Sequence, residues 1–302
     1  FETKKEISIL NKDLIYLNKL IKSKNFLDEY LIDEIKKTSE ELNENKYHRR
    51  TKIYIEEESQ DQISFEEFIE VDKLTITVTR EGLIKSYKDH IDINKLTSNQ
   101  KDLVNIYHIM SNQKLLIFTS SGRVFTIDPN KLPSGKSNAK NFIYYVDSNM
   151  SDKLVKLIPF SENLKYLIAS SHGKGFLADL NNIQTSQKKG KQLFNLKNND
   201  QVIKVILANK THLASVNKDG KMLIFKIKEL PILQRGGGVQ LQKIKEPNLL
   251  SDIQIFNLDE GISWKTGSLN KNEKKIKLWF GKRAQSGKNV PKRFNKNLKF
   301  YE

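Results

Sequence analysis

The chain has 302 residues, no Cys and a formal net charge of +16, with 52 Lys and Arg against 36 Asp and Glu. Its 37% hydrophobic and 29% charged residues are typical of a globular protein of about two domains. The absence of Cys excludes disulfides, Cys-ligated zinc, iron–sulfur clusters and thiol catalysis, and no run of about 18 apolar residues could span a membrane. The chain begins at Phe1 without an initiator Met or an apolar signal segment, so we expect a fragment of a longer protein.

The charge is divided unevenly along the chain. Residues 1–72 carry 12 Lys and Arg against 18 Asp and Glu, whereas residues 73–302 carry 40 against 18, a net charge of +22. Such asymmetry indicates a polyanionic partner for the basic part, although the charge would also serve solubility alone. Because no basic amphipathic helix with aromatic residues on its apolar face is visible, nucleic acid is favoured over a membrane surface.

The first 50 residues are predicted to be helical. Leu and Ile recur at steps of three and four, as in the seam of a coiled coil, at Ile7, Leu10, Leu14, Leu17 and Ile21. The pattern breaks at Ser23 and restarts at Leu27, which predicts two antiparallel helices joined by a short turn. Residues 51–72, with the run Glu56-Glu57-Glu58, are expected to form an acidic linker and the first strand rather than a Mg²⁺ site.

From residue 73 to residue 302 the sequence repeats one unit: an apolar strand, two or three polar residues, a Gly and a second strand. The spacings between successive units are 40, 51, 47 and 41 residues, with the glycines at Gly82, Gly122, Gly173, Gly220 and, more weakly, Gly261. Each unit is interpreted as a hairpin whose turn uses Gly for a positive φ. This period predicts a mainly β, propeller-like array of about five blades, preceded by the two-helix segment.

Loops that follow these hairpins place Gly beside a cation, at residues 132–136, 187–191 and 234–238. Exposed backbone N–H groups together with a cation can grip a phosphate, and recurrence once per unit would set such loops around the edge of a ring. We therefore predict that nucleic-acid phosphates contact the cations in or near the turns, the loops and a terminal Gly-Lys-Arg motif. These cations are Lys85, Arg123, Lys136, Lys174, Lys188, Lys189, Lys191, Lys221, Arg235, Lys282 and Arg283.

No catalytic or metal site is predicted. Gly135-Lys136-Ser137 is similar to the end of a P-loop, but that motif needs a Gly where Asn130 stands. None of the five His residues has metal-ligand spacing with a carboxylate, and no nucleophile elbow is present. Trp264 and Trp279, with Phe280, are expected to anchor the core of the last blade.

Three segments carry a family resemblance. They are residues 235–243 (RGGGVQLQK) with 250–253 (LSDI), the ending 279–288 (WFGKRAQSGK) with 291–294 (PKRF), and residues 47–51 (YHRRT). The first two resemble the C-terminal domain of the A subunits of bacterial DNA topoisomerase IV, a type IIA topoisomerase, and the ending is similar to alphaproteobacterial members. The third resembles the end of the coiled-coil arm that precedes this domain, although His48 stands where the family usually has an acidic residue.

The resemblance implies a β-pinwheel, a closed disc of blades that exchange strands with their neighbours and bind DNA on a basic rim. Catalysis in the family belongs to an upstream region with the nucleophilic Tyr and the metal site, and to an ATPase subunit. The implied partners are therefore duplex DNA, a second A subunit, and the B subunit, which is the ATPase. Mg²⁺ and ATP would be used by the full enzyme and no cofactor by this chain, at the nucleoid in the bacterial cytoplasm.

The related gyrase A subunit carries a Gln-Arg-Arg-Gly-Gly-Lys-Gly box that lets its domain wrap DNA. Residues 234–240 (QRGGGVQ) lack the second Arg and the Lys of that box, which favours topoisomerase IV. The expected function is sequence-nonspecific duplex binding that supports ATP-dependent relaxation and decatenation. The alternatives are a propeller-like scaffold for protein interactions with incidental charge and, disfavoured by the lack of a convergent catalytic set, an enzyme with its own active site.

Overall fold

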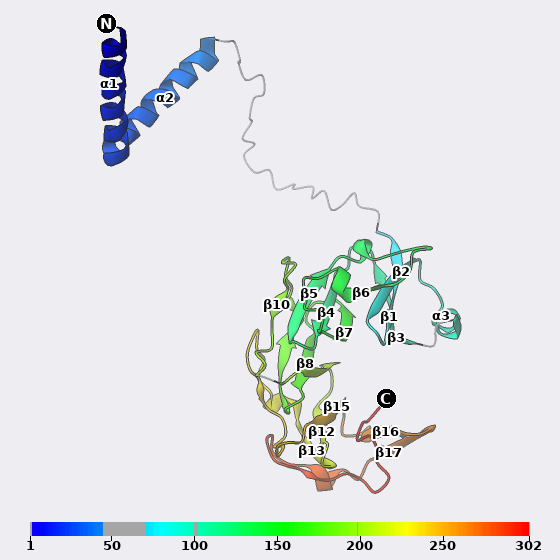
Figure 1. Cartoon of the computed structure of the whole chain (residues 1–302). Coiled ribbons are helices and arrows are strands. Elements are labelled where there is room, and N and C mark those ends of the chain that lie inside the picture. The colour runs from blue at the N-terminus through cyan, green and yellow to red at the C-terminus, as the bar shows by residue number, and fades with distance from the viewer. Residues whose placement is uncertain (1, 45–70, 100–101, 198, 302) are drawn as a thin grey trace, which may run out of the picture. The chain divides into compact units, whose positions relative to one another are not determined.

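The computed structural model describes residues 2–44, 71–99, 102–197 and 199–301 (Figure 1). The chain forms two compact units, Phe1–Phe68 and Ile69–Glu302. The linker predicted at 51–72 lies outside the described residues except for its last two positions, and so do residues 47–51.

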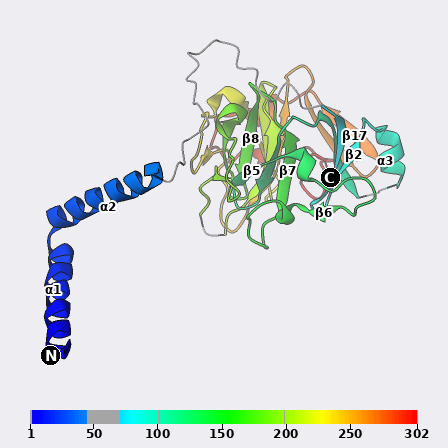
Figure 2. The same ribbon diagram turned by 90° about the horizontal axis from the view of Figure 1, so that it is seen from above.

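The helical unit consists of α1 (Glu2–Lys22) and α2 (Lys24–Glu44), which are separated at Ser23 alone. The predicted break is confirmed and its cause is local, because Ser23 Oγ accepts a hydrogen bond from the N–H of Phe26 at 3.4 Å and so caps α2. Tyr16 meets Phe26 edge to face beside this connection, with ring centroids 5.7 Å apart. Away from the connection the helices diverge (Figure 2), and the seam residues of α1 stay more than half exposed. The two helices therefore do not pack along the predicted seam.

The described residues of the second unit form four four-stranded antiparallel sheets and one two-stranded sheet. The strand orders are β3-β1-β2-β6, β10-β5-β4-β7, β11-β8-β9-β14, β15-β12-β13-β18 and β16-β17, and we number these sheets one to five. The strand bounds are β1 (Lys73–Thr79), β2 (Leu83–Lys88), β3 (Leu103–Met110), β4 (Leu115–Thr119), β5 (Arg123–Ile127), β6 (Lys140–Asn141), β7 (Leu154–Pro159), β8 (Lys165–Ser170), β9 (Lys174–Asp179), β10 (Lys191–Gln192), β11 (Val202–Leu207), β12 (His212–Asn217), β13 (Lys221–Lys226), β14 (Val239–Gln240), β15 (Leu250–Phe256), β16 (Ile262–Thr266), β17 (Leu269–Glu273) and β18 (Lys288–Asn289). A short helix, α3 (Ile93–Asn99), joins β2 to β3. The predicted mainly β array of five units is confirmed.

Each complete sheet borrows its outer strand from the chain that follows the next hairpin. β6 pairs with β2, β10 with β5, β14 with β9, and β18 with β13. The first residue after each borrowed strand donates its N–H to the carbonyl of the Gly in the borrowing hairpin. These bonds are Phe142 to Gly82, Leu193 to Gly122, Leu241 to Gly173, and Val290 to Gly220. This is the strand exchange that the resemblance implied.

The hairpins of the first four sheets have turns of the same geometry, each with a Gly at the same position. This recurring Gly is what makes the repeat recognisable in the sequence. In each, the N–H of the Gly donates to the carbonyl three residues earlier at 3.0 Å, with φ between 71° and 78°. The fifth unit differs from the prediction. Gly261 also has a positive φ, but it lies between β15 and β16, which belong to different sheets. The fifth hairpin turns instead at Gly267, in a two-residue loop between Thr266 and Leu269.

The core lies between successive sheets, which explains why the hairpin strands are apolar without alternation. In β4, Leu115 and Ile117 join a buried cluster with the first sheet, whereas Leu116 and Phe118 join a cluster with the third. Because side chains alternate between the faces of a strand, a sheet covered on both faces is apolar at every position. Two further clusters link sheets three to four and four to five.

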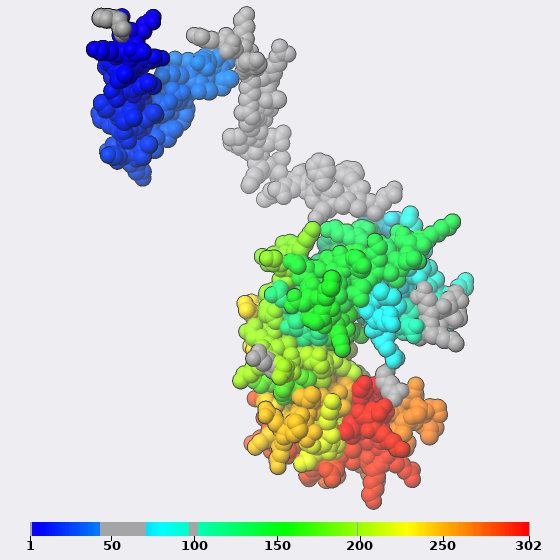
Figure 3. Space-filling model, in the orientation of Figure 1, coloured from blue at the N-terminus to red at the C-terminus, as the bar shows by residue number. Residues whose placement is uncertain are grey.

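The end of the chain packs against the last sheet, because Phe294 and Phe300 are buried in the same cluster as Trp264. Trp264 and Trp279 are buried in the cluster between sheets four and five, as predicted, whereas Phe280 is 39% exposed and is not a core residue. In the space-filling view the colour of the second unit changes from cyan and green at the top, through yellow, to red and orange at the bottom (Figure 3). Among the described residues, no strand pairing and no buried cluster joins sheet five to sheet one. The closed disc implied by the resemblance is therefore not seen there.

Candidate nucleic-acid interface

The borrowed strands β6, β10, β14 and β18, with the loops before them, form the edge that we call the outer rim. The opposite edges are β3, β7, β11 and β15, and successive members of this set contact one another. At the rim, the residue after the turn Gly faces an amide side chain of the borrowed strand in sheets two to four. These pairs are Arg123 with Gln192, Lys174 with Gln240, and Lys221 with Asn289. Three predicted cations thus occupy equivalent positions in consecutive sheets.

The amides hold the turns and loops together. Gln192 Nε2 donates to the carbonyls of Ser121 at 3.0 Å and Phe194 at 2.7 Å. Gln240 Nε2 donates to the carbonyls of His172 at 3.2 Å and Gln242 at 2.7 Å. Because the backbone at the rim is fixed by these bonds, the neighbouring cations are displayed from a rigid base.

The arginines of the predicted set are partly engaged within the protein. Arg123 donates to the carbonyl of Lys189, and Arg283 donates to the carbonyl of Gln240 at 2.7 Å. Arg235 is exposed, with its Nε 3.2 Å from Asn195 Oδ1. The bond of Arg123 holds the loop before β10 to its own sheet, whereas the bonds of Arg235 and Arg283 link rim segments of neighbouring sheets. Each leaves part of the guanidinium for a ligand.

The predicted lysines differ in exposure, and Lys174 and Lys221 at the turns are half-buried. Lys136, Lys188, Lys189 and Lys282 are exposed in the rim loops. Lys191 is half-buried, and its Nζ donates to the carbonyl of Asn182 at 2.7 Å. Lys85 differs from all the others. It lies mid-strand in β2, with its Nζ over the ring of Tyr87 at 5.0 Å, and the structure does not bring it to the turn positions of the other sheets.

Sequence reasoning missed two rim lysines. Lys140 and Lys288 are the first residues of β6 and β18, the positions that Lys191 occupies in β10, and both are exposed. A strand of two residues has no periodicity to detect, so only the repeated Gly-cation loops before it could have marked these positions.

Other cations are structural and lie on the opposite edges of the sheets. Lys156 Nζ donates to Asn105 Oδ1 at 3.0 Å, and Lys204 Nζ lies 2.8 Å from Asp252 Oδ1. These four residues are the third positions of β7, β3, β11 and β15. Burial, and then the charge of Lys204, lower the pKa of Lys156. The +22 charge is therefore not distributed over the rim alone.

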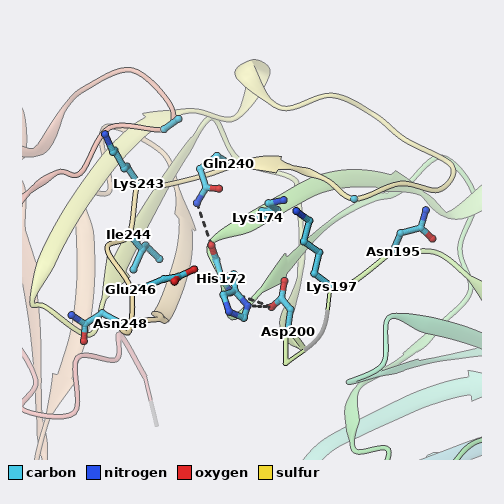
Figure 4. A pocket seen from close by; sticks show the side chains of 12 residues that line it. His172, Lys174, Asn195, Lys197, Asp200, Gln240, Lys243, Ile244, Glu246 and Asn248 are labelled. Carbon is cyan, nitrogen blue, oxygen red and sulfur yellow. Dashed lines mark hydrogen bonds and ion pairs between the residues drawn. The ribbon is translucent and has the colours of Figure 1, made fainter.

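A cavity of about 590 Å³ opens at the rim, where the turn of sheet three meets the loops that lead into sheet four (Figure 4). We call it the rim groove. Its lining includes the cations Lys174, Lys197 and Lys243, and the pair His172 and Asp200. His172 Nδ1 lies 3.0 Å from Asp200 Oδ1. Burial raises the pKa of Asp200, but hydrogen bonds from His172 and Ser171 outweigh it and hold the pKa below its usual range.

Within the part of the chain that the structure describes, no three His, Asp or Glu side chains are placed to hold a metal ion. None of the described helices has the length and apolar character needed to cross a membrane. The feature that recurs along the outer rim is a cation at an equivalent position in consecutive sheets, next to backbone held by hydrogen bonds.

The comparisons with known proteins agree with this fold. The family model of the DNA gyrase C-terminal domain, beta-propeller, matches residues 113–141, 165–209 and 211–257. The A subunit of DNA topoisomerase 4 from Rickettsia bellii is 33% identical over 235 residues, which are 77% of this chain and 32% of the relative. The Rickettsia prowazekii subunit is 31% identical over 299 residues, 98% of this chain and 40% of the relative. The chain thus spans well under half the length of these curated relatives.

A solved structure supports the fold independently. The C-terminal domain of Escherichia coli ParC superposes with a TM-score of 0.65 at 22% identity, over 74% of this chain and 96% of that chain. The crystal structure of a C-terminal domain of DNA topoisomerase IV superposes with a TM-score of 0.62 at 21% identity. Together with the repeat, the strand exchange and the terminal motif, these matches show that the chain belongs to the family of C-terminal domains of bacterial DNA gyrase and topoisomerase IV A subunits.

Proposed function

We propose that the second unit binds duplex DNA along its outer rim, by contacts to phosphates and without reading base sequence. The observation that carries the proposal is the equivalent placement of Arg123, Lys174 and Lys221 in three consecutive sheets, beside loops that carry further cations. Evenly repeated cations match a ligand whose charge also repeats, and phosphate contacts position a duplex without specifying its sequence.

In a full-length protein of the relatives' kind, this DNA binding would support the topoisomerase reaction. We propose that the chain is part of a topoisomerase IV A subunit, where it holds a duplex for ATP-dependent relaxation and decatenation at the bacterial nucleoid. Its partners would be a second A subunit, together with the ATPase B subunit, and Mg²⁺ and ATP would act in those other parts. By itself the chain should be catalytically inactive, and covalent trapping of this purified chain on DNA would contradict that.

The test is the salt dependence of duplex binding. Each phosphate neutralised steepens the slope of log K against log salt by about 0.9, so five or more contacts give a slope steeper than about −4. Duplexes of equal length and different sequence should bind with similar affinity. A flat slope, or no retardation of any duplex at low salt, would contradict the proposal and favour the scaffold alternative.

A further inference from the structure

The rim groove combines cations from separate segments of the chain. Lys174 begins β9, and Lys197 lies in the connection between β10 and β11. Both line the same cavity, and Figure 4 draws the amino ends of their side chains toward the same side of it. Lys243, in the connection between β14 and β15, lines the cavity at its other end.

These ammonium groups have no ion-pair partner among the described residues. The two carboxylates of the lining are placed otherwise. The side chain of Asp200 is only 5% exposed, and its Oδ1 accepts hydrogen bonds from Ser171 Oγ at 2.8 Å and from the N–H of His172 at 3.1 Å. Glu246 is exposed on the wall with Ile244, away from Lys174 and Lys197. Like charges that share a cavity and form no ion pair repel each other, and a bound anion would remove that cost.

The backbone of the groove is also suited to an anion. Gly237 lines it and is exposed, and its N–H has no hydrogen-bond acceptor among the described residues. Ala284, on the same lining, is held at a φ of 67°, a strained conformation for a residue with a side chain. Its N–H donates to the carbonyl of Leu241 at 3.0 Å, which fixes this loop against the borrowed strand. An unpaired N–H and two ammonium groups on the lining of one cavity are the kinds of donor that bind phosphate oxygens.

We infer that the rim groove is a phosphate-binding site, in which Lys174, Lys197 and the N–H of Gly237 hold one phosphate group. The inference deepens the proposed function and rests on it for the natural ligand, a phosphodiester of the duplex backbone. The same donors would also accept free inorganic phosphate, so the two sources are separated by experiment.

The first experiment compares two charge-matched double variants of the whole chain. The groove double is K174Q/K197Q. The control double is K165Q/K226Q, which removes two exposed lysines at the opposite ends of the hairpin strands in sheets three and four. Removal of one phosphate contact reduces the salt slope of duplex binding by about 1. The groove double should therefore bind duplex DNA with a shallower slope, whereas the control double should keep the slope of the unmodified chain.

The second experiment uses inorganic phosphate as the probe and the His ring C–H signals in NMR as the readout. His172 lies in the groove, whereas His90 and His108 stack on each other at 4.7 Å in sheet one and serve as internal controls. Titration at constant ionic strength should move the His172 signal to saturation and leave the two controls in place. The K174Q/K197Q variant should remove the saturable shift.

The outcomes separate the groove from the proposed function. If the unmodified chain binds duplex but the two doubles lower the slope equally, the groove inference is overturned, whereas duplex binding by the second unit stands. If duplex does not bind but His172 responds saturably to phosphate, the groove stands with free phosphate as its ligand and the DNA proposal fails. If all His signals drift together, phosphate is not bound in the groove and the inference is refuted.

Discussion

The loop before β10 offers the sharpest test of which cations contact DNA. Lys188 and Lys189 are exposed there, and Gly190, between Lys189 and Lys191, has a φ of 64°. Lys191 is half-buried, and its Nζ is engaged by the carbonyl of Asn182. We therefore expect the variant K188Q/K189Q to lose two phosphate contacts, and the further change Lys191→Gln to add less than either of the first two.

The magnitude follows from counterion release. Without these two contacts, the slope of log K against log salt should be shallower by about 1.8. The affinity ratio of the unmodified chain to the variant should then shrink by about 12-fold as salt rises from about 50 to 200 mM. Fluorescence anisotropy of a labelled duplex at four or five salt concentrations measures both slopes directly.

The matched control removes the same charge from the helical unit, as K12Q/K22Q. Both lysines are exposed on α1, and their loss changes the net charge by the same amount. If only the overall field mattered, the two doubles would weaken binding equally. Equal slopes for the two doubles would refute the assignment of contacts to the rim, although DNA binding itself would survive.

Three further predictions concern stability. Gly122→Ala should destabilise the protein by about 2–4 kcal/mol, because the new Cβ would lie 2.6 Å from the carbonyl oxygen of Phe194 at a φ of 78°, whereas Gly135→Ala, with open space, should cost only about 1 kcal/mol. Burial, and then a nearby lysine, lower the pKa of His212, so the free energy of unfolding should fall as pH drops below about 6.5, and His212→Leu should flatten that dependence. Asp252→Ala should cost about 3 kcal/mol, because it removes a buried carboxylate that pairs with a lysine and accepts the N–H of residue 300 at 3.0 Å.

Urea unfolding measures the free energy of unfolding of each variant and so tests all three predictions. Equal losses for the two glycine variants would contradict the steric account of the turn. A His212→Leu protein with the pH dependence of the unmodified chain would show that another group titrates. An Asp252→Ala protein of unchanged stability would mean that the carboxylate does not help to hold β11 against β15.

Much of the fold could be predicted because its signals are local. The turn Gly needs a positive φ whatever surrounds it, so Gly82, Gly122, Gly173 and Gly220 mark four hairpins in the bare sequence. The break at Ser23 also has a local cause, because its hydroxyl caps the helix that follows. The prediction of a fifth hairpin turn at Gly261 was wrong because Gly261 also has a positive φ, but in a connection between two sheets.

The borrowed strands could not be predicted in this way. Lys140 and Asn141 pair with a strand that begins at Leu83, and two residues carry no periodicity. Their position depends on backbone bonds to a distant Gly, such as the one from Phe142 to Gly82. The sequence also could not predict that the two helices diverge after Ser23. The same pattern of Leu and Ile residues is found in helices that pack along the seam and in helices whose seam stays exposed.

The sequence by itself determined the repeat, the excess of positive charge and the family. Only the tertiary structure decided which cations lie on the outer rim. Arg123, Lys174 and Lys221 are brought to equivalent rim positions by strand exchange, whereas Lys204 is turned to a buried carboxylate on the opposite edge. The two groups do not differ in residue type or local pattern. What separates them is the edge of the sheet on which pairing between distant segments places each strand, and that pairing is set by long-range backbone hydrogen bonds and by the cores between sheets.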